Sequence, residues 1–381
     1  MAAPDGSARA SPPGRADRVV DVLVVGAGQA GLGAAYHLTR DPGLRVLVLD
    51  AAPVGHSWLD RWDSLTLFTP RRFSGLPGLR FPPGAGRCPS RTEMADYLRD
   101  YARRFALPVE TGVRVHRLTR DGSGFVAATS TGRVRARHVV VATGPFHQPY
   151  RPPASGDLDP AVWQRHSRDY RRPADVPDGD VLVVGGGNSA AQLAVELADA
   201  GRRVTLASPA RPWFLPETIL SVSVYWWIYL TGVLNADRDA AVSRRIRCRG
   251  DAIVGTRLRT LVRRGRVRLL PHRVTGAHGR HVTLADTTTV AVTSILWCTG
   301  FRPDTSWIDI PGALDHDGTP VHDTGASPVP GLHWMGLPWQ TRLNSSIIDG
   351  VDRDARATAR RITGSRHRTR TGSSRDDMIA R

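Results

Sequence analysis

The amino-acid sequence predicts an α/β protein with two Rossmann-like dinucleotide-binding units. A Gly-rich turn separates an apolar strand from a helix within residues 20–50, and a near copy of this pattern occupies residues 180–206. One such turn means little in a chain with 38 glycines. Two complete strand–turn–helix–strand units are hard to obtain by chance, and they therefore carry the fold prediction.

The first unit has a suitable residue type for each part of a dinucleotide cradle. Its apolar strand at 20–25 ends in the turn Gly26-Ala27-Gly28-Gln29-Ala30-Gly31. In this pattern the first glycine permits the tight turn, the second lets a pyrophosphate approach the backbone, and the third lets the helix pack on the strand. The free N–H groups at the helix start then face the phosphates. Asp50, at the end of the second strand, can accept hydrogen bonds from a ribose diol.

The second unit differs from the first at the end of its second strand. Its first strand, at 180–184, is followed by the turn Gly185-Gly186-Gly187-Asn188-Ser189-Ala190. No acid follows the second strand at 203–206, where Ser208 and Arg211 stand instead. The missing carboxylate favours a ribose with a 2′-phosphate, and hence NADPH over NADH, which leaves the first unit to hold FAD. The alternative for Arg211 is a solvated surface side chain.

Composition excludes several classes of protein. The net charge of +17 comes with 52 basic residues that are all arginine, which indicates the codon bias of a GC-rich genome. The arginines are scattered without interleaved aromatics, so no nucleic-acid partner is expected. The three cysteines, Cys88, Cys248 and Cys298, form no CxxC and no metal-binding spacing. This argues against a thiol-disulfide flavoenzyme and a metal site, and it suits a reducing cytoplasm.

Other segments give local predictions. Ser90 and Glu93 have the spacing of a capping box at a helix start. The apolar run at 219–234 is shorter than the ~18 residues that a transmembrane helix needs. We therefore expect no membrane span there but a buried or interfacial helix, which could also form a homodimer interface. A further helix is expected at 345–362, and residues 1–17 contain no apolar signal-peptide core.

Six stretches resemble the flavin-dependent monooxygenases that carry FAD and NADPH on one chain. The resemblance covers residues 18–362 and includes the bacterial members that share RWDSLTLFTP and GLPWQTR, a branch assigned to ion transport or to arsenic-associated flavin monooxygenases. The stretches are GAGQAG at 26–31, GHSW at 55–58, HSRDY at 166–170, GGGNSA at 185–190, CTGFRPD at 298–304 and GLHWMGLPWQTR at 331–342.

The family places an NADPH-binding domain inside an FAD-binding domain, with two crossings at Ala142-Thr143-Gly144 and Cys298-Thr299-Gly300. Combined with ends whose composition indicates disorder, it implies the following division of the chain: a leader at 1–17, the first part of the FAD domain at 18–150, the NADPH domain with its linker and a helical insert (213–265) at 151–285, the second part of the FAD domain at 286–362, and a basic tail at 363–381.

The resemblance also implies cofactor contacts outside the two glycine turns. Near FAD it places Ser57, Trp58, Trp62 and Thr69, and near NADPH it places Ser189, Ala190 and Gln192. Thr143, Gly144 and Gly300 would meet cofactor at the crossings, and Leu337 completes the cofactor-binding set. The helix from about residue 345 would aim its N-terminus at the pyrimidine edge of the flavin; simple packing against the first domain is the alternative.

Two departures from the family pattern concern candidate catalytic residues. Before His166 the usual Phe-x-Gly is absent and Trp163 replaces the Phe. His166 could position NADPH, or it could hold the linker by hydrogen bonds. Phe68 stands where many members have an Asn that supports the oxygenated flavin, and Thr69 is one of its polar neighbours. We take Phe68, Thr69 and His166 as the catalytic candidates.

The predicted function is that of an NADPH-dependent flavin monooxygenase. NADPH would reduce FAD, and the reduced flavin would convert O2 to a C4a-hydroperoxide that oxygenates a small lipophilic substrate. Water must be kept from that species, and apolar material for this purpose is present in Trp58, Trp62, Phe68 and the aromatic run at 225–227. An oxidase or reductase without oxygen insertion is the alternative that Phe68 favours. A non-catalytic flavin-binding regulator is the third reading, against which the intact second unit argues.

Overall fold

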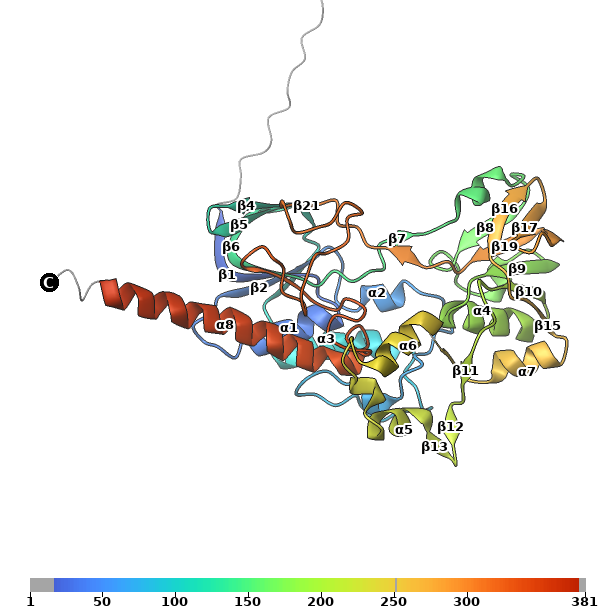
Figure 1. Cartoon of the computed structure of the whole chain (residues 1–381), viewed down its shortest axis with the longest axis horizontal. Helices are drawn as coiled ribbons and strands as arrows, with labels where there is room; N and C mark the ends of the chain where they lie inside the picture. The colour runs from blue at the N-terminus through green and yellow to red at the C-terminus, as the bar shows by residue number, and fades with distance from the viewer. Residues whose placement is uncertain (1–16, 251, 377–381) are drawn as a thin grey trace, which may run out of the picture.

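The structure, a computed structural model, describes residues 17–250 and 252–376, with side chains to residue 364. Two α/β units lie side by side, and the chain passes from the first to the second and back again (Figure 1). Apart from Asp17, the expected leader lies outside the described residues. The predicted α/β fold with two Rossmann-like sheets is confirmed.

The first sheet has eight strands in the order β21-β4-β5-β6-β1-β2-β3, with β22 pairing β6. β22, β6, β1, β2 and β3 run parallel, while β4, β5 and β6 form an antiparallel meander. The strand bounds are β1 Arg18–Val25, β2 Val46–Asp50, β3 Val109–Thr111, β4 Val115–Asp121, β5 Gly124–Thr129, β6 Gly132–Val141, β21 Ile308–Asp309 and β22 Leu332–Trp334.

Both faces of the first sheet are buried, which explains why β1 is almost continuously apolar. Val22 and Val24 pack on the face covered by helix α1 (Gln29–Leu38). Leu23 and Val25 pack on the opposite face with residues of the meander and with Trp334. Helix α3 (Arg91–Arg104) lies beside α1 and begins with the predicted capping box. The short helix α2 (His56–Leu59) and the 3-10 turn η1 (Arg71–Phe73) lie on the loop between β2 and α3.

The second sheet is fully parallel, with the order β15-β10-β9-β19-β8. Helices α4 (Asn188–Asp199) and α7 (Arg257–Arg263) connect its strands, and a small antiparallel sheet β16-β17-β18 adjoins it. The remaining bounds are β8 Trp163–His166, β9 Asp180–Val184, β10 Arg203–Ala207, β15 Val267–Leu270, β16 Val274–His278, β17 His281–Leu284, β18 Thr289–Ala291 and β19 Ser294–Trp297.

The two passages between the units pair with each other. β7 (Gln148–Pro149) and β20 (Phe301–Arg302) form a two-stranded antiparallel ribbon. The outgoing passage then contains the 3-10 turns η2 (Pro153–Asp157) and η3 (Pro173–Asp175) on either side of β8, an edge strand of the second sheet. β19 also belongs to that sheet, beyond the boundary expected at residue 285, so the chain returns to the first unit only after Trp297.

The insert expected to be helical over 213–265 is a mixture of short elements. Pro212 and Pro216 stand near its start, where proline disfavours helix, and Gly232 has a φ of +73°. β12 and β13 form a hairpin and β11 pairs with β14. The bounds are β11 Phe214–Leu215, β12 Thr218–Ile219, β13 Val222–Ser223, α5 Val224–Leu230, η4 Val233–Asn235, α6 Ala241–Arg249 and β14 Ile253–Val254.

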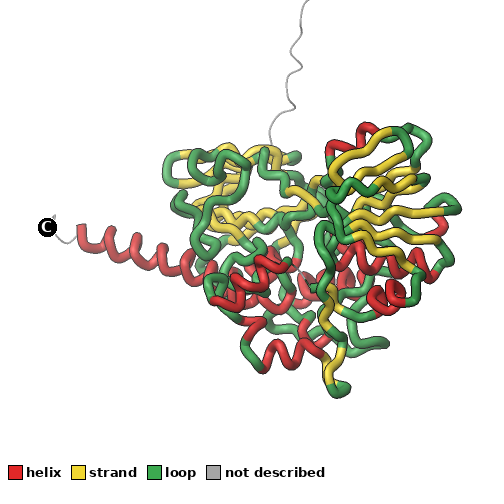
Figure 2. The backbone as a smooth tube through the Cα atoms, turned by 45° about the vertical axis from the view of Figure 1, so that its right-hand side comes forward, coloured by secondary structure: helices red, strands yellow, loops and turns green. Residues whose placement is uncertain are grey.

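The C-terminal helix differs at both ends from the prediction of 345–362. The 3-10 turn η5 (Ile348–Gly350) leads into α8 (Val351–Asp376) (Figure 2). Residues 363–376, expected in a disordered basic tail, continue this helix, because extending a nucleated helix costs far less than starting one. Residues 377–381 lie outside the described residues. α8 packs along α1, where the Gly33 position lies against Val351.

Candidate cofactor and active site

The first Gly-rich turn has an open side where a phosphate would approach. Gly26 has a φ of +106°, and a Cβ there would lie 2.5 Å from the carbonyl oxygen of Ala142. A Cβ on Gly31 would overlap the carbonyl oxygen of Gly26. A Cβ on Gly28 would meet no atom within 4 Å. The fold itself therefore needs glycine at 26 and 31, whereas glycine at 28 keeps space free at the first turn of α1.

Asp50 fastens this turn to the end of β2. Its Oδ2 accepts a hydrogen bond from the backbone N–H of Ala27 at 2.7 Å, and its Oδ1 accepts one from Ala52 at 2.8 Å. A carboxylate offers about four lone-pair sites, so each oxygen keeps capacity for a further donor. The side chain is partly exposed, which suits a ribose hydroxyl arriving from outside.

The second Gly-rich turn repeats this geometry. Gly185 has a φ of +153°, and a Cβ there would overlap the carbonyl oxygen of Cys298. A Cβ on Gly187 would meet nothing within 4 Å. Ala190 replaces the third glycine and is fully buried, so α4 accommodates its methyl group. In both units the open position in front of the helix is thus the second glycine of the GxGxxG pattern, which is Gly28 in the first unit and Gly187 in the second.

Two polar residues near the second turn, Asn188 and Ser208, form hydrogen bonds within the protein. The amide of Asn188 donates to the carbonyl of Ala252 at 2.9 Å and accepts from the N–H of Val254 at 3.0 Å, which ties the insert to the turn. Ser208 is buried and its hydroxyl donates to the carbonyl of Ala210. Arg211 is exposed. That exposure is compatible both with a 2′-phosphate partner and with a solvated surface residue.

Each crossing lies against the first glycine of one unit. The N–H of Ala142 donates to the carbonyl of Val25, and the carbonyl of Ala142 lies against Gly26. In the second unit, the N–H of Cys298 donates to the carbonyl of Val184, and the carbonyl of Cys298 lies against Gly185. Thr143 follows the first of these contacts and is partly exposed. Gly144 and Gly300 both have a positive φ, and a Cβ on either would meet no atom within 4 Å, so the backbone is open at both crossings. The repeat therefore extends to the crossings that the sequence indicated.

His166 joins the outgoing passage to the returning one. It is completely buried, its Nε2 donates to the carbonyl of Gly300 at 3.0 Å, and its Nδ1 accepts from the N–H of Arg168 at 3.2 Å. Burial lowers the pKa of the imidazole to about 4, so the ring is neutral at pH 7. Both ring nitrogens are engaged within the protein, which supports the linker-holding role of the two that the sequence left open.

The same junction contains an arginine that sequence reasoning missed. The guanidinium of Arg61 lies over the rings of Phe146 and Phe301, at 4.8 and 4.7 Å from their centroids. Burial lowers its pKa to about 10. Asp60 next to it pairs with Arg171 at 2.8 Å. In a chain with 52 arginines, nothing in the sequence distinguished Arg61 from the rest.

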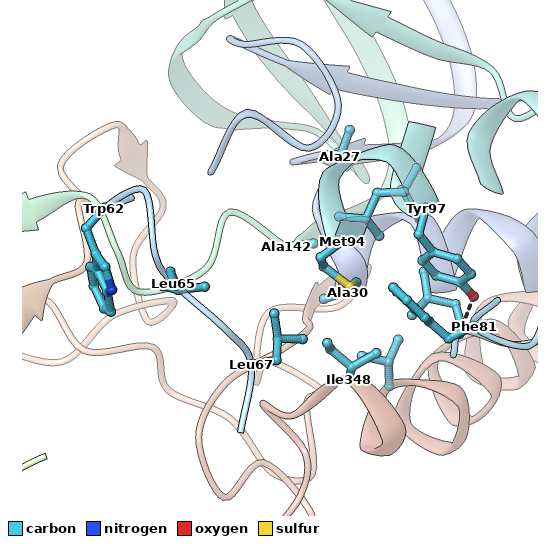
Figure 3. Close-up of a cluster of buried hydrophobic side chains, with 14 of the residues drawn as sticks. Ala27, Ala30, Trp62, Leu65, Leu67, Phe81, Met94, Tyr97, Ala142 and Ile348 are labelled. Atoms are coloured by element: carbon cyan, nitrogen blue, oxygen red, sulfur yellow. Dashed lines mark hydrogen bonds between the residues drawn. The ribbon is translucent and has the colours of Figure 1, made fainter. Parts of the chain in front are cut away.

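The loop after α2 brings only part of the predicted apolar pocket together. Phe68 and Trp226 both pack against the buried cluster of Phe73, Val224 and Tyr225. Trp62 is buried in the separate core beneath α1, and Trp58 packs against that core. Figure 3 shows this second group, in which Leu67 and Ile348 are drawn near Ala30 of the Gly-rich turn and Leu65 is drawn between Leu67 and Trp62. Trp227, also expected in the pocket, is 38% exposed.

Thr69 is a buried residue of this loop and pairs with a residue of the insert. The hydroxyl of Tyr225 is hydrogen-bonded to the Thr69 side chain, and burial raises the pKa of the phenol. Between the two units, the amide of Gln192 on α4 donates to the carbonyl of Thr66 at 3.1 Å. The predicted NADPH contact Gln192 and the predicted FAD contact Thr69 therefore belong to one region. The predicted contacts Ser57 and Ser189 are exposed.

The segment before α8 covers the start of α1 and carries a carboxyl group that the sequence analysis missed. Gln29 donates to the carbonyl of Ser346 at 3.2 Å, and the N–H of Leu337 donates to Gln340 in the same segment. Asp349 accepts from the amide of Asn344 at 3.1 Å, and its other oxygen is buried without a partner among the described residues. Burial raises the pKa of Asp349 to about 6. An acid directly after two isoleucines is the signal in the sequence.

This geometry is that of an enzyme class in which one chain has two dinucleotide-binding turns and two paired crossings between the units. The chain belongs to the pyridine nucleotide-disulphide oxidoreductase family, whose model matches residues 23–231. It is 41% identical over 337 residues to an "Uncharacterized oxidoreductase CzcO-like" of Geobacillus kaustophilus, covering 88% of this chain and 96% of that one. It is 37% identical over 345 residues to the "Uncharacterized oxidoreductase CzcO" of Bacillus subtilis, covering 90% and 99%.

A solved structure with the same architecture is the flavin-containing monooxygenase from Stenotrophomonas maltophilia. Its TM-score is 0.76 at 30% sequence identity, and the match covers 91% of this chain and 99% of that one. The predictions of an oxidoreductase and of the flavoprotein monooxygenase class are confirmed at the level of the family. Among solved structures with the same fold, an ornithine N-hydroxylase of Kutzneria contains FAD and NADP+, and a cyclohexanone monooxygenase of Rhodococcus contains NADP+.

The disulphide in the family's description has no counterpart here. Cys88, Cys248 and Cys298 are all free, and burial raises the pKa of the Cys298 thiol. Among the described residues, no group of three or more His, Cys, Asp and Glu side chains is placed to hold a metal ion. In the same part of the chain, no helix is both long and apolar enough to cross a membrane.

Proposed function

We propose that this protein is an NADPH-dependent FAD monooxygenase that oxygenates a small lipophilic molecule. The observation that carries the proposal is the pair of open glycines, Gly28 and Gly187. Each stands at the start of a helix, and a Cβ on either would meet no atom within 4 Å. Two dinucleotides on one chain are what a reaction needs when one cofactor delivers a hydride and the other receives it.

In this proposal the first unit holds FAD and the second holds NADPH. The N–H groups at the start of α1 meet the pyrophosphate of FAD, and Asp50 accepts from its ribose. The start of α4 meets the pyrophosphate of NADPH, and the exposed Arg211 meets its 2′-phosphate. When bound, FAD supplies the redox chemistry, taking a hydride from NADPH and activating O2 once it is reduced.

The chain's own part is to orient the cofactors and to keep water away. Phe68, Tyr225 and Trp226 form an apolar wall between the insert and the loop after α2. The paired hydroxyls of Thr69 and Tyr225 are buried at this wall. Neutral His166 holds the two crossings together. The three free cysteines support a reducing cytoplasm as the compartment in which the protein acts.

An NADPH oxidase or reductase without oxygen insertion is the second candidate. Phe68 supports it, because no polar side chain stands at this position, where the family resemblance places an Asn. NADPH consumption, measured with and without a thioether or ketone substrate and with hydrogen peroxide followed in parallel, separates the two. Consumption coupled to oxygenated product supports the monooxygenase. Peroxide formed at the same rate without substrate would refute it in favour of the oxidase.

A further inference from the structure

An apolar projection stands out from the insert. We use this name for residues 218–230, which comprise the β12–β13 hairpin and α5. Figures 1 and 2 show them at the lower end of the molecule, away from both sheets. Nine large apolar side chains are exposed in the part of the chain that the structure describes, and most belong to this projection: Ile219, Leu220, Val222, Trp227, Tyr229 and Leu230.

The tip of the hairpin holds its leucine in a costly position. Leu220 and Ser221 have φ of +49° and +63°, which costs a residue other than glycine about 1 kcal/mol or more. Leu220 is nevertheless 85% exposed, and Leu230 on α5 is 71% exposed. Packing within the described chain does not offset this strain. A structure that strains its backbone to present an apolar side chain to the outside indicates a binding surface.

The projection is held firmly from behind. Tyr225 and Trp226 pack on Phe73, with ring centroids 5.9 and 5.1 Å apart. Trp227 donates its indole N–H to the carbonyl of Ile219 at 3.3 Å, which joins α5 to the hairpin. One face of α5 is therefore anchored in the protein while the other is free, as in an amphipathic helix that lies in a membrane interface.

The residues on and around the projection match an anionic lipid surface. Tryptophan and tyrosine, here Trp227 and Tyr229, are the aromatic residues enriched at the boundary between lipid headgroups and acyl chains. Arg72 stacks over Trp226 with its guanidinium 5.7 Å from the ring, and Arg87 donates to the carbonyl of Glu217 at the base of the hairpin. Both arginines are exposed, in a chain of net charge +17. Basic side chains beside an apolar insertion strengthen binding to anionic lipid.

A second copy of the chain fits this surface less well. Pairing about a two-fold axis would place Arg72 and Arg87 of one copy close to the same arginines of the other copy. Like charges at an interface oppose association. A stable protein interface also needs about 800 Å² of complementary surface on each partner. A narrow projecting hairpin suits insertion among lipid headgroups better than a flat contact. We propose that the apolar projection docks the protein on an anionic bilayer surface without spanning it.

Vesicle flotation of the full-length protein tests this. Wild type is mixed with vesicles of phosphatidylcholine alone, or of phosphatidylcholine with phosphatidylglycerol, at low and high salt. The Leu220→Ser/Leu230→Ser variant removes the two most exposed leucines. Val19→Ser removes a side chain that is 54% exposed on β1, far from the projection, and serves as the matched control. Thermal melting of each variant verifies folding.

Wild type and Val19→Ser should float with the anionic vesicles, more at low salt than at high salt. The double variant should bind about a hundredfold more weakly, because each inserted leucine contributes roughly tenfold to the partition. Arg72→Gln should weaken binding to the anionic vesicles only. The proposal is overturned if wild type ignores anionic vesicles at low salt, or if the folded double variant floats as well as wild type. A wild-type dimer that ignores vesicles and becomes monomeric in the double variant would identify a second copy as the occupant.

Discussion

Gly26 and Gly28 stand two residues apart in the same turn, yet alanine should act on them in opposite ways. At Gly28 the new methyl group meets no protein atom within 4 Å, and the φ of −77° suits any residue. Gly28→Ala should therefore leave the stability of the apoprotein unchanged, or raise it by up to about 1 kcal/mol by restricting the unfolded chain. What the methyl group occupies is the space through which the pyrophosphate of FAD would reach the backbone.

The expected loss in FAD affinity can be estimated from the hydrogen bonds at risk. If two charge-assisted bonds from backbone N–H groups are lost, at roughly 1.5 kcal/mol each, the cost is about 3 kcal/mol. This corresponds to an affinity lower by a factor of about a hundred. Gly26→Ala differs, because a left-handed φ and a methyl group 2.5 Å from the Ala142 oxygen both strain the fold itself.

The assay measures FAD retained after dialysis, by flavin absorbance, together with urea unfolding of the apoproteins. Gly28→Ala should lose flavin while unfolding at the wild-type urea concentration. Gly26→Ala should unfold earlier. A Gly28→Ala protein that retains FAD as tightly as wild type, or whose apoprotein is destabilised, would refute the assignment of this opening to the cofactor. Gly187→Ala gives the parallel test for NADPH, with KM as the readout.

Three further predictions concern single side chains. Arg211→Ser should raise the KM for NADPH about tenfold and leave that for NADH unchanged, since it removes one partner of the 2′-phosphate; an equal change with both nucleotides would assign Arg211 to the solvated surface. His333 is buried, and burial lowers its pKa to about 3. Below about pH 6.5 this histidine binds a proton in the unfolded chain but not in the folded one, so the free energy of unfolding should fall as pH drops from 6.5 towards 3, by about 2 kcal/mol at pH 5. Urea unfolding across this range should show a flatter pH dependence in His333→Leu, and an unchanged slope contradicts the reasoning. Asp349, with a pKa raised to about 6, destabilises the folded state increasingly as pH rises from about 4 through 6. Asp349→Asn should therefore stabilise the apoprotein by on the order of 3 kcal/mol at pH 8 and hardly at all at pH 4, and equal effects at both values would show that the carboxyl is not perturbed.

Local sequence patterns predicted the parts of the fold that depend on local physics. The pattern predicts a tight turn at Gly26 and close packing at Gly31, and the geometry at both positions confirms this. The approach of a pyrophosphate at Gly28 stays a prediction, for which the space beside the backbone is free. The spacing of Ser90 and Glu93 predicts the capping box at the start of α3, and the structure confirms it. The two crossings follow from the family resemblance, and the short apolar strand that ends in a glycine at each of them agrees with it.

Features that depend on distant parts of the chain escaped prediction. Gln29 meets Ser346 across 317 residues, and no local pattern announces that contact. Arg61 acquires its role only because Phe146 and Phe301 are brought to it by the fold. The apolar run at 219–234 predicts a helix, and it contains most of the hairpin at 218–223, because a short apolar run cannot be assigned to helix or strand by its periodicity alone.

The pairing of the two crossings has a mechanical consequence. Two separate strands would let the units tilt and twist independently, but the β7–β20 ribbon and the His166–Gly300 bond unite them into one connection. A double-stranded connection resists twisting more than a single strand does, and the Gln192–Thr66 bond between the units restricts their relative motion further. Because each crossing also contacts the first glycine of a cradle, any bend moves both cradles together. The distance between a bound hydride donor and its acceptor would then vary along a single coordinate, which a mutation in the ribbon could tune without touching either cofactor.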